Sequence, residues 1–308
     1  MKIKVALEYF YPWTNSGGFY YSQINKIFEN FGFDIEFVLT EPLKGDAVTY
    51  LSQQEVDFAI CPTNRLFVRC DKGEPLVGIA AINHTGLESI QTLKKFKIQR
   101  PKDLENHSIA LNPTPRGVAM LKHLVEQDGG NFELVNLIDL GTRELTPEDL
   151  DAGLAHAIFG GYWVWEALMT SRIPKNEQVV LPVSQWNAPR YHSYVLSINK
   201  NNQKLNEVQI SQFLKALRIG YLSLQKEPTL AVDIYEKVIP YFPKILIKSS
   251  LEAVSSTWFN EAGDWGIQSS QKHQEYAEWL YHHKIIENPN IWKSATTNIF
   301  LNGDENVN

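Results

Sequence analysis

Aromatic side chains and a carboxylate follow a short apolar run near the middle of the chain. The run ends at Gly160-Gly161, and Tyr162, Trp163 and Glu166 come next. The two glycines allow close approach of a ligand or a second backbone, and the spacing of three puts Trp163 and Glu166 on one side of a helix. An aromatic wall beside a carboxylate suits an aminopyrimidine, whose ring stacks while the carboxylate accepts from its amine or binds a protonated ring nitrogen. The alternative is an acidic first turn of a helix with core aromatics; we favour the ligand role.

A second aromatic group lies in the loop at residues 8–18, after the first apolar run. This loop contains Tyr9, Trp13 and Asn15 and ends in two glycines. Flat side chains bury a large area at low rotamer cost and stack on flat ligands. They could instead cap the core or join two lobes. We expect Tyr9, Trp13 and Asn15 to contact the ligand.

Three further segments carry polar groups that could reach the same ligand. Thr63 and Asn64 follow a third apolar run, where either could cap a helix and Asn64 could offer its amide to a ring. Arg116 stands at a Pro-started helix, whose N–H groups favour an anionic or electron-rich group; an ordinary helix start is the alternative. Tyr191 and His192 lie in a later connection and could close over the ligand, although a lone histidine is more often structural.

Composition narrows the function classes. The chain has 308 residues and a formal net charge of −6, so nucleic-acid binding would need a local basic patch. Residues 94–102 are the best candidate and are predicted to be a solvated turn. Cys61 and Cys70 define neither a metal motif nor a disulfide framework, and we expect no metal and no cofactor. No run reaches the roughly 18 apolar residues of a membrane span.

The first residues lead directly into a strand pattern, without the features of a signal peptide. We therefore expect either a cytoplasmic protein or the mature form of a periplasmic or otherwise extracytoplasmic one.

Strand and helix patterns alternate along the first two thirds of the chain, which predicts an α/β fold with mainly parallel sheets. The last third has a helical apolar period. We expect strands at residues 2–7, 33–39, 56–60, 75–82, 108–111, 132–138, 155–159 and 194–198. We expect helices at residues 17–30, 46–52, 64–70, 115–127 and 163–171, a helix start at 146–149, and helices from about 205 onward.

The order of these elements predicts two lobes. The first lobe comprises residues 1–90 and 191–301, the second comprises residues 91–190, and residues 302–308 form a flexible polar tail. Two chain crossings imply a hinge, with a ligand cleft at the carboxyl ends of the strands.

Several short motifs resemble those of the thiamine-pyrimidine family. This family includes ABC-transporter binding proteins for formylaminopyrimidine and related precursors, and fungal enzymes that make hydroxymethylpyrimidine. The resemblance covers most of the chain and implies the type II periplasmic-binding-protein fold. The motifs are Tyr9 with Pro12-Trp13-Thr14-Asn15, Asp57-Phe58-Ala59-Ile60, the stretch at residues 101–110, Gly161 to Glu166, and Tyr276-Ala277 with Trp279-Leu280.

Departures from the enzyme branches favour a binding protein. The fungal enzymes have a lysine and a histidine just after the third strand, where this chain has Cys61 and Arg65, and their cysteine-rich iron motif is missing. The related desulfinases have a cysteine in the first loop, which lacks one here. The resemblance thus implies the substrate-binding protein of an ABC importer, with a permease as partner and a small heteroaromatic ligand. An enzyme on the same fold, acting on a small aromatic substrate, is the alternative.

Overall fold

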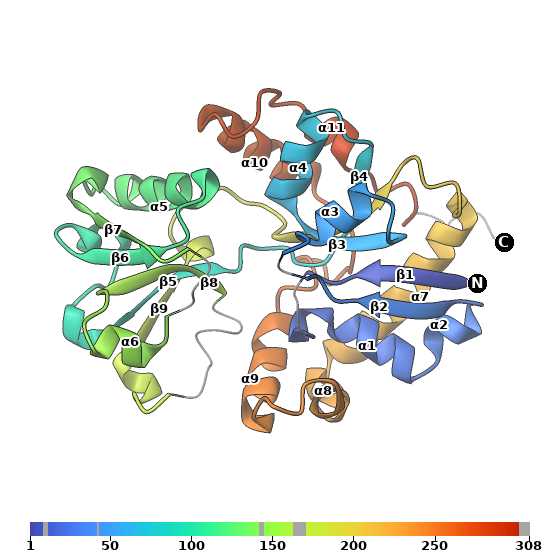
Figure 1. Cartoon of the computed structure of the whole chain (residues 1–308), viewed down its shortest axis with the longest axis horizontal. Coiled ribbons are helices and arrows are strands. Elements are labelled where there is room, and N and C mark those ends of the chain that lie inside the picture. The colour runs from blue at the N-terminus through green and yellow to red at the C-terminus, as the bar shows by residue number, and fades with distance from the viewer. Residues whose placement is uncertain (9–11, 42, 142–144, 163–170, 302–308) are drawn as a thin grey trace. The chain divides into compact units, whose positions relative to one another are not determined.

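Figure 1 shows the computed structural model, which describes residues 1–8, 12–41, 43–141, 145–162 and 171–301. The chain divides into two compact units. Unit 1 comprises Met1–Thr85 and Tyr191–Asn308, and unit 2 comprises Gly86–Arg190. Each unit contains one five-stranded sheet flanked by helices, which confirms the predicted α/β fold. The predicted tail at residues 302–308 lies outside the described residues.

The sheet of unit 1 has the strand order β2-β1-β3-β10-β4. β1 pairs in parallel with β2 and β3, whereas β10 is antiparallel to both of its neighbours. Because β10 comes from the segment after residue 190, the returning chain is inserted between β3 and β4. The strands are β1 (Lys2–Ala6), β2 (Asp34–Val38), β3 (Phe58–Pro62), β4 (Leu76–Ala81) and β10 (Tyr194–Asn199).

Helices cover both faces of this sheet (Figure 1). On one side lie α1 (Gly17–Ile24), α2 (Ile27–Asn30) and α7 (Glu207–Gln225), with α8 (Val232–Val238) and α9 (Lys244–Ser255) near them. On the other side lie α3 (Ala47–Ser52), α4 (Thr63–Asp71), α10 (Ser270–His282) and α11 (Trp292–Ala295). Side-chain caps fix several helix starts: Asp46 accepts from the Thr49 N–H, and Asn206 forms a capping box with Gln209.

Two glycines allow α1 and α7 to pack closely. A Cβ atom on Gly220 would lie 2.0 Å from the Ser22 Oγ and 2.4 Å from the Gly18 carbonyl oxygen. A Cβ atom on Gly18 would lie 2.3 Å from the Tyr221 ring. The separation of these helices therefore depends on both residues having no side chain.

The sheet of unit 2 has the order β7-β6-β8-β5-β9. Its parallel part is β6 (Ser108–Leu111) between β7 (Asn136–Asp139) and β8 (Ala157–Tyr162), and β5 (Glu88–Leu93) pairs antiparallel with β8 and with β9 (Gln178–Pro182). The α-helices within the described residues of this unit are α5 (Pro115–Gln127) and α6 (Pro147–Asp151). They begin at capping threonines, Thr114 and Thr146, each followed by a proline in the first turn.

Several elements differ from the sequence prediction. The helix expected at residues 17–30 is broken at Lys26, which has a φ of 57°. The strand expected at 132–138 is confined to Asn136–Asp139, because Phe132–Leu134 forms a 3-10 turn. Strands β5 and β9 were not predicted. The helix expected at 163–171 falls almost entirely outside the described residues.

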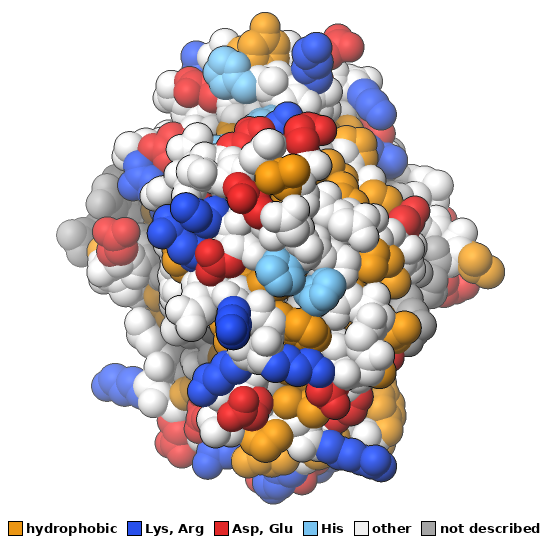
Figure 2. Space-filling view, turned by 90° about the vertical axis from the view of Figure 1, so that its left-hand side faces the viewer, with side chains coloured by type: hydrophobic (Ala, Val, Ile, Leu, Met, Phe, Trp, Pro, Cys, Tyr) orange, Lys and Arg blue, Asp and Glu red, His pale blue; other side chains and the backbone are white. Residues whose placement is uncertain are grey.

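Charged groups of both signs are interspersed on the face of the molecule shown in Figure 2. In the basic stretch at residues 94–102, the Lys95 Nζ lies 2.5 Å from the Asp151 Oδ1, and Arg100 pairs with Asp128. These ion pairs agree with the predicted solvated turn. Across the part of the chain that the structure describes, no helix is both long enough and apolar enough to cross a membrane.

The close approach of α1 and α7 predicts a stability loss in Gly220→Ala. The added methyl group must displace Ser22 or the α1 backbone, and such overpacking costs about 1–3 kcal/mol. Urea unfolding of both proteins measures this loss. Ser223→Ala, on the same helix, is the control and is expected to change the free energy of unfolding by less than about 0.5 kcal/mol. Equal unfolding midpoints for Gly220→Ala and the wild type would contradict the argument.

Candidate functional site

One edge of the unit 1 sheet brings together segments that are distant in the sequence. The carboxyl ends of β1, β3 and β4 meet there, with the amino end of β10. The chain leaves β1 toward β2 on one side and returns to β3 on the other, so the strand order reverses between β1 and β3. In open α/β sheets, ligands bind at such a switch point, outside the carboxyl ends of the strands.

Glu8 follows β1 at this edge, and the residue as a whole is partly exposed. The Asn15 Nδ2 donates to the Glu8 Oε1 at 3.1 Å, and the Ser16 Oγ donates to the Oε2 at 3.4 Å. Asn15 and Ser16 belong to the 3-10 turn Thr14–Ser16, directly before α1. The start of the helix therefore fixes the orientation of the carboxyl group.

Asn15 is fully buried and is the centre of a polar network. Its Nδ2 also donates to the Asn83 Oδ1 at 2.9 Å, and the Asn83 Nδ2 donates back to the Asn15 Oδ1 at 2.7 Å. Asn83 donates further to the Thr257 Oγ1 at 2.8 Å, and the Trp258 Nε1 donates to the Asn15 Oδ1 at 3.1 Å. Each polar atom of the Asn15 amide thus has a partner, as burial demands.

Burial raises the pKa of Glu8 to about 7, because the hydrogen bonds from its own backbone N–H, from Asn15 and from Ser16 only partly offset the cost of removing the charge from water. Near neutral pH, this carboxyl group is present in both forms. It can accept hydrogen bonds as a carboxylate, or donate one and accept another as an acid.

The other predicted residues of unit 1 gather at the same edge, mostly in buried positions. Trp13 is 1% exposed and meets Tyr194 edge to face at 6.0 Å. The Thr63 hydroxyl donates to the His192 carbonyl at 2.6 Å and does not cap α4, while Asn64 is partly exposed. Tyr191 stacks on the Tyr276 ring of α10, with ring centres 4.4 Å apart.

His192 is the middle member of a histidine row that also contains His84 and His273. The ring centres are 5.0 Å apart for His84 and His192, and 4.9 Å apart for His192 and His273. The His192 Nε2 accepts from the Ser269 N–H at 2.9 Å. Burial lowers the pKa of His84 to about 4 and that of His273 to about 3, and also holds that of His192 below its usual value. All three rings are therefore neutral at pH 7.

The predicted residues of unit 2 lie at the carboxyl edge of its own sheet. Arg116 forms an ion pair with Glu88, and the two side chains are only 11% and 15% exposed. Tyr162 is the last residue of β8, opposite Glu88 in register. Tyr9, Trp163 and Glu166 lie outside the described residues. Their predicted contacts with a ligand stay predictions, as do those of Trp13, Asn15, Thr63, Asn64, Arg116, Tyr162, Tyr191 and His192.

Cys61 is poorly placed to act as a nucleophile, the role it could have if the protein were an enzyme. Its side chain is fully buried at the end of β3, and burial raises the pKa of the thiol far above its usual value. A reactive cysteine needs an accessible thiolate. No group of three metal-binding side chains is found among the residues that the structure describes.

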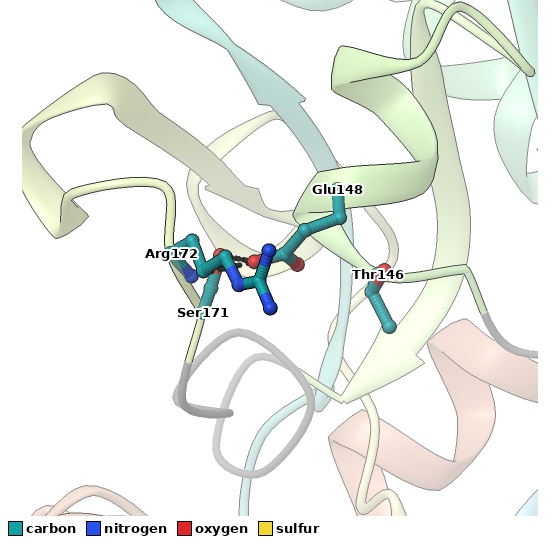
Figure 3. Close-up of a pocket in the computed structure, with 4 residues that line it drawn as sticks. All are labelled: Thr146, Glu148, Ser171 and Arg172. Carbon is teal, nitrogen blue, oxygen red and sulfur yellow. Dashed lines mark hydrogen bonds between the residues drawn. The ribbon is translucent and has the colours of Figure 1, made fainter.

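Two hollows among the described residues are not lined by Glu8, Asn15 or Ser16. The first, of about 550 Å³ on unit 2, is bordered by Thr146, Glu148, Ser171 and Arg172 (Figure 3). There Glu148 accepts from the Ser171 Oγ at 2.7 Å and from the Arg172 N–H at 2.5 Å, and the serine bond is the main cause of its lowered pKa. The second, of about 260 Å³, lies beside α10 and α11 in unit 1.

Sequence reasoning did not identify Glu8, Asn83 or the histidine row. A weak signal for Glu8 exists, because it is the first charged residue after the apolar end of the first strand. Asn83 is the first polar residue after the apolar run of the fourth strand. Nothing local points to the histidine row, since its members are joined only by the fold.

Two mixed sheets, each flanked by helices, define a periplasmic-binding-protein fold. Its similarity to a known structure is clear: the periplasmic aliphatic sulphonate binding protein SsuA from Escherichia coli superimposes with a TM-score of 0.70 at 13% identity. The match covers 96% of this chain and 91% of that chain.

The chain belongs to the NMT1/THI5 like family, which it matches over residues 13–231. This confirms the family indicated by the sequence motifs. A formylaminopyrimidine-binding protein from Halalkalibacterium halodurans is 23% identical over 303 residues, which are 96% of this chain and 90% of the relative. A putative thiamine biosynthesis protein from Haemophilus influenzae is 24% identical over 246 residues, which are 80% of this chain and 75% of the relative.

The Asn15 network predicts a large stability loss in Asn15→Leu. The substitution keeps the volume similar but leaves Glu8, Asn83 and Trp258 without their partner, which should cost about 3 kcal/mol. Urea unfolding at pH 7 measures it. The exposed Asn201 supplies the control Asn201→Leu, with an expected change below about 0.5 kcal/mol. Similar losses in both variants would show that the network contributes little.

The histidine row predicts acid lability. A histidine with a lowered folded pKa binds fewer protons in the folded than in the unfolded state, so stability falls as the pH drops from about 6.5 toward 4. His273→Gln should reduce the slope of unfolding free energy against pH in that window by about one proton. His282→Gln, at an exposed position of the same helix, is the control. An unchanged slope in His273→Gln would refute this assignment.

Proposed function

We propose that this protein is the substrate-binding component of an ABC importer and that it binds a thiamine-precursor pyrimidine or a closely similar small heteroaromatic. The observation that carries the proposal is the set of Glu8, Asn15 and Ser16 at the switch point of the unit 1 sheet. An oriented carboxyl group with a pKa of about 7 can pair with the amino-substituted edge of such a ring.

Sequence similarity to family relatives supports the same ligand class. The chain spans nearly the whole of a family relative named for binding formylaminopyrimidine, and a second relative is named for thiamine biosynthesis. The E. coli structure with the same fold is named as a periplasmic binding protein. We accordingly propose a membrane permease as partner and an extracytoplasmic place of action.

The proposal divides the predicted site residues into two groups. Asn64, Arg116 and Tyr162, with the undescribed Tyr9, Trp163 and Glu166, are proposed to contact the ligand. Trp13, Asn15, Thr63, Tyr191 and His192 are proposed to support the site, because in this structure their side chains are buried in unit 1. A supporting role would preserve the geometry of Glu8 without direct contact.

Calorimetry with a panel of ligands tests the ligand class. Hydroxymethylpyrimidine and formylaminopyrimidine are expected to bind with a Kd of about 1 μM or lower, which corresponds to about 8 kcal/mol. An aliphatic sulfonate and a riboflavin-type ring are the comparison ligands and should bind at least about tenfold more weakly. If none of the pyrimidines binds, the proposed ligand class is wrong.

Native mass spectrometry of freshly purified protein gives an independent measurement. A bound small molecule with the mass of an aminopyrimidine would support the proposal. A retained sulfonate or other anion would contradict it.

A further inference from the structure

We propose that Glu8 selects ligands by an amidine-like edge, a ring nitrogen beside an amino group, and that binding such a neutral ligand to the ionised carboxyl group takes up one proton from solution. This inference rests on the proposed function, and it names the group that recognises the ligand. Sequence reasoning assigned a carboxylate of this kind to Glu166, which lies outside the described residues.

The two oxygens of Glu8 are not equivalent. The Oε1 lies 3.1 Å from the Asn15 Nδ2, an amide nitrogen that can only donate, so this oxygen must act as an acceptor. The Oε2 lies 3.4 Å from the Ser16 hydroxyl, a weaker contact whose hydrogen can rotate. Glu8 also accepts a hydrogen bond from its own backbone N–H. Of the two side-chain contacts, the one with Ser16 is the one that leaves an oxygen able to carry a proton, so we place the proton of the acid form on the Oε2.

The network behind Glu8 prevents the opposite arrangement. Turning the Asn15 amide over would exchange its Nδ2 and Oδ1, and the Oδ1 now accepts from both Asn83 and Trp258. The Trp258 Nε1 can only donate. Asn15 is thus locked with its N–H toward Glu8.

An aminopyrimidine matches this asymmetric carboxyl group. The protonated Oε2 donates to a ring nitrogen, and the Oε1 accepts from the neighbouring amine, which closes a pair of hydrogen bonds. If the proton moves from the Oε2 to the ring nitrogen, the same pair persists as a carboxylate with a cationic ring. In both forms, the complex contains one more proton than an ionised Glu8 and a neutral ligand contain together. That proton must come from solution.

The surroundings of Glu8 favour this use over anion binding. The titratable groups whose pKa values respond to its charge are Tyr20 on α1, Tyr221 on α7, Tyr235 on α8 and Cys61 on β3. All of these groups are neutral near pH 7, because burial raises the pKa of each. A sulfonate beside the ionised carboxylate would meet its repulsion. A cation also lies near this edge, because the Lys272 Nζ on α10 donates to the carbonyl of His84, the residue after Asn83, at 2.8 Å.

The pH dependence of binding follows directly. Burial raises the pKa of Glu8 to about 7, so above that pH the carboxyl group must first regain its proton. The affinity for hydroxymethylpyrimidine should fall about tenfold for each pH unit above 7. Calorimetry in two buffers of different ionisation enthalpy should show an uptake approaching one proton at pH 8.5.

Glu8→Gln is the decisive variant. A glutamine amide has an N–H donor in place of the acid O–H and keeps a carbonyl acceptor, so it imitates the protonated Glu8 at every pH. It should bind hydroxymethylpyrimidine at pH 6.5 within about threefold of wild type. Above pH 7, it should lose both the decline in affinity and the proton uptake. Glu36→Gln, which alters an exposed carboxylate paired with Lys2, is the matched control and should behave as wild type.

A ligand-free measurement accompanies the binding curves. A carboxyl group with a raised folded pKa stabilises the folded state at low pH, and this stability is lost as the pH rises from about 4.5 to about 7. The free energy of unfolding is measured against pH for wild type and for Glu8→Gln. The difference between the two curves should contain the decline caused by Glu8, because the opposite effect of the histidine row is present in both proteins and cancels.

The outcomes separate the two proposals. If the pyrimidines bind but Glu8→Gln has the same pH dependence as wild type, Glu8 is not the recognition group and the proposed function stands. If the pyrimidines do not bind at any pH, the proposed function fails and the inference fails with it. If an aliphatic sulfonate binds as tightly as the pyrimidine at pH 7, selection by Glu8 is overturned.

Discussion

The reciprocal hydrogen bonds between the amides of Asn15 and Asn83 hold the carboxyl edge of the unit 1 sheet together. These residues are 68 positions apart and follow two different strands, β1 and β4. Tyr221 and Tyr235 reinforce the arrangement, since their hydroxyls donate to the carbonyls of Asn15 and Trp13 at 3.0 and 2.7 Å. A buried polar network is stable only when all of its hydrogen bonds are formed. The packing of the core therefore fixes the orientation of Glu8.

The two units handle buried carboxyl groups in opposite ways. In unit 2, Glu88 is paired with Arg116, so its charge is neutralised by a guanidinium. In unit 1, Glu8 accepts from the neutral side chains of Asn15 and Ser16, and burial raises its pKa to about 7. A charge buried without a cation destabilises a protein, whereas a neutral acid in the same place does not. The surroundings of Glu8 therefore favour the protonated carboxyl group. This is the form that can donate to a ring nitrogen and accept from the amino group beside it.

Local patterns predicted most strands of both units but not the whole fold. Strands β1, β2, β3, β4, β6, β8 and β10 are runs or alternations of apolar residues, which the sequence displays directly. The strand β5 (Glu88–Leu93) is stabilised by pairing with β8 and β9 rather than by its own pattern, and the helix break at Lys26 is marked by neither glycine nor proline. The sequence indicated candidate residues in the loops that follow strands, but it did not predict that many of them are buried. Asn15 is enclosed partly by Trp258, 243 residues away, and no local pattern contains that information.

The fold alone does not determine which ligand is bound, since a sulphonate-binding protein shares it at 13% identity. Selectivity must therefore come from the side chains placed at the strand ends. Near this edge of unit 1, the titratable groups that respond to Glu8 are phenols and a thiol, all neutral at pH 7. When Glu8 is ionised, its carboxylate repels an anion placed beside it. When Glu8 is protonated, it offers a donor and an acceptor to a ligand that has an amino group next to a ring nitrogen.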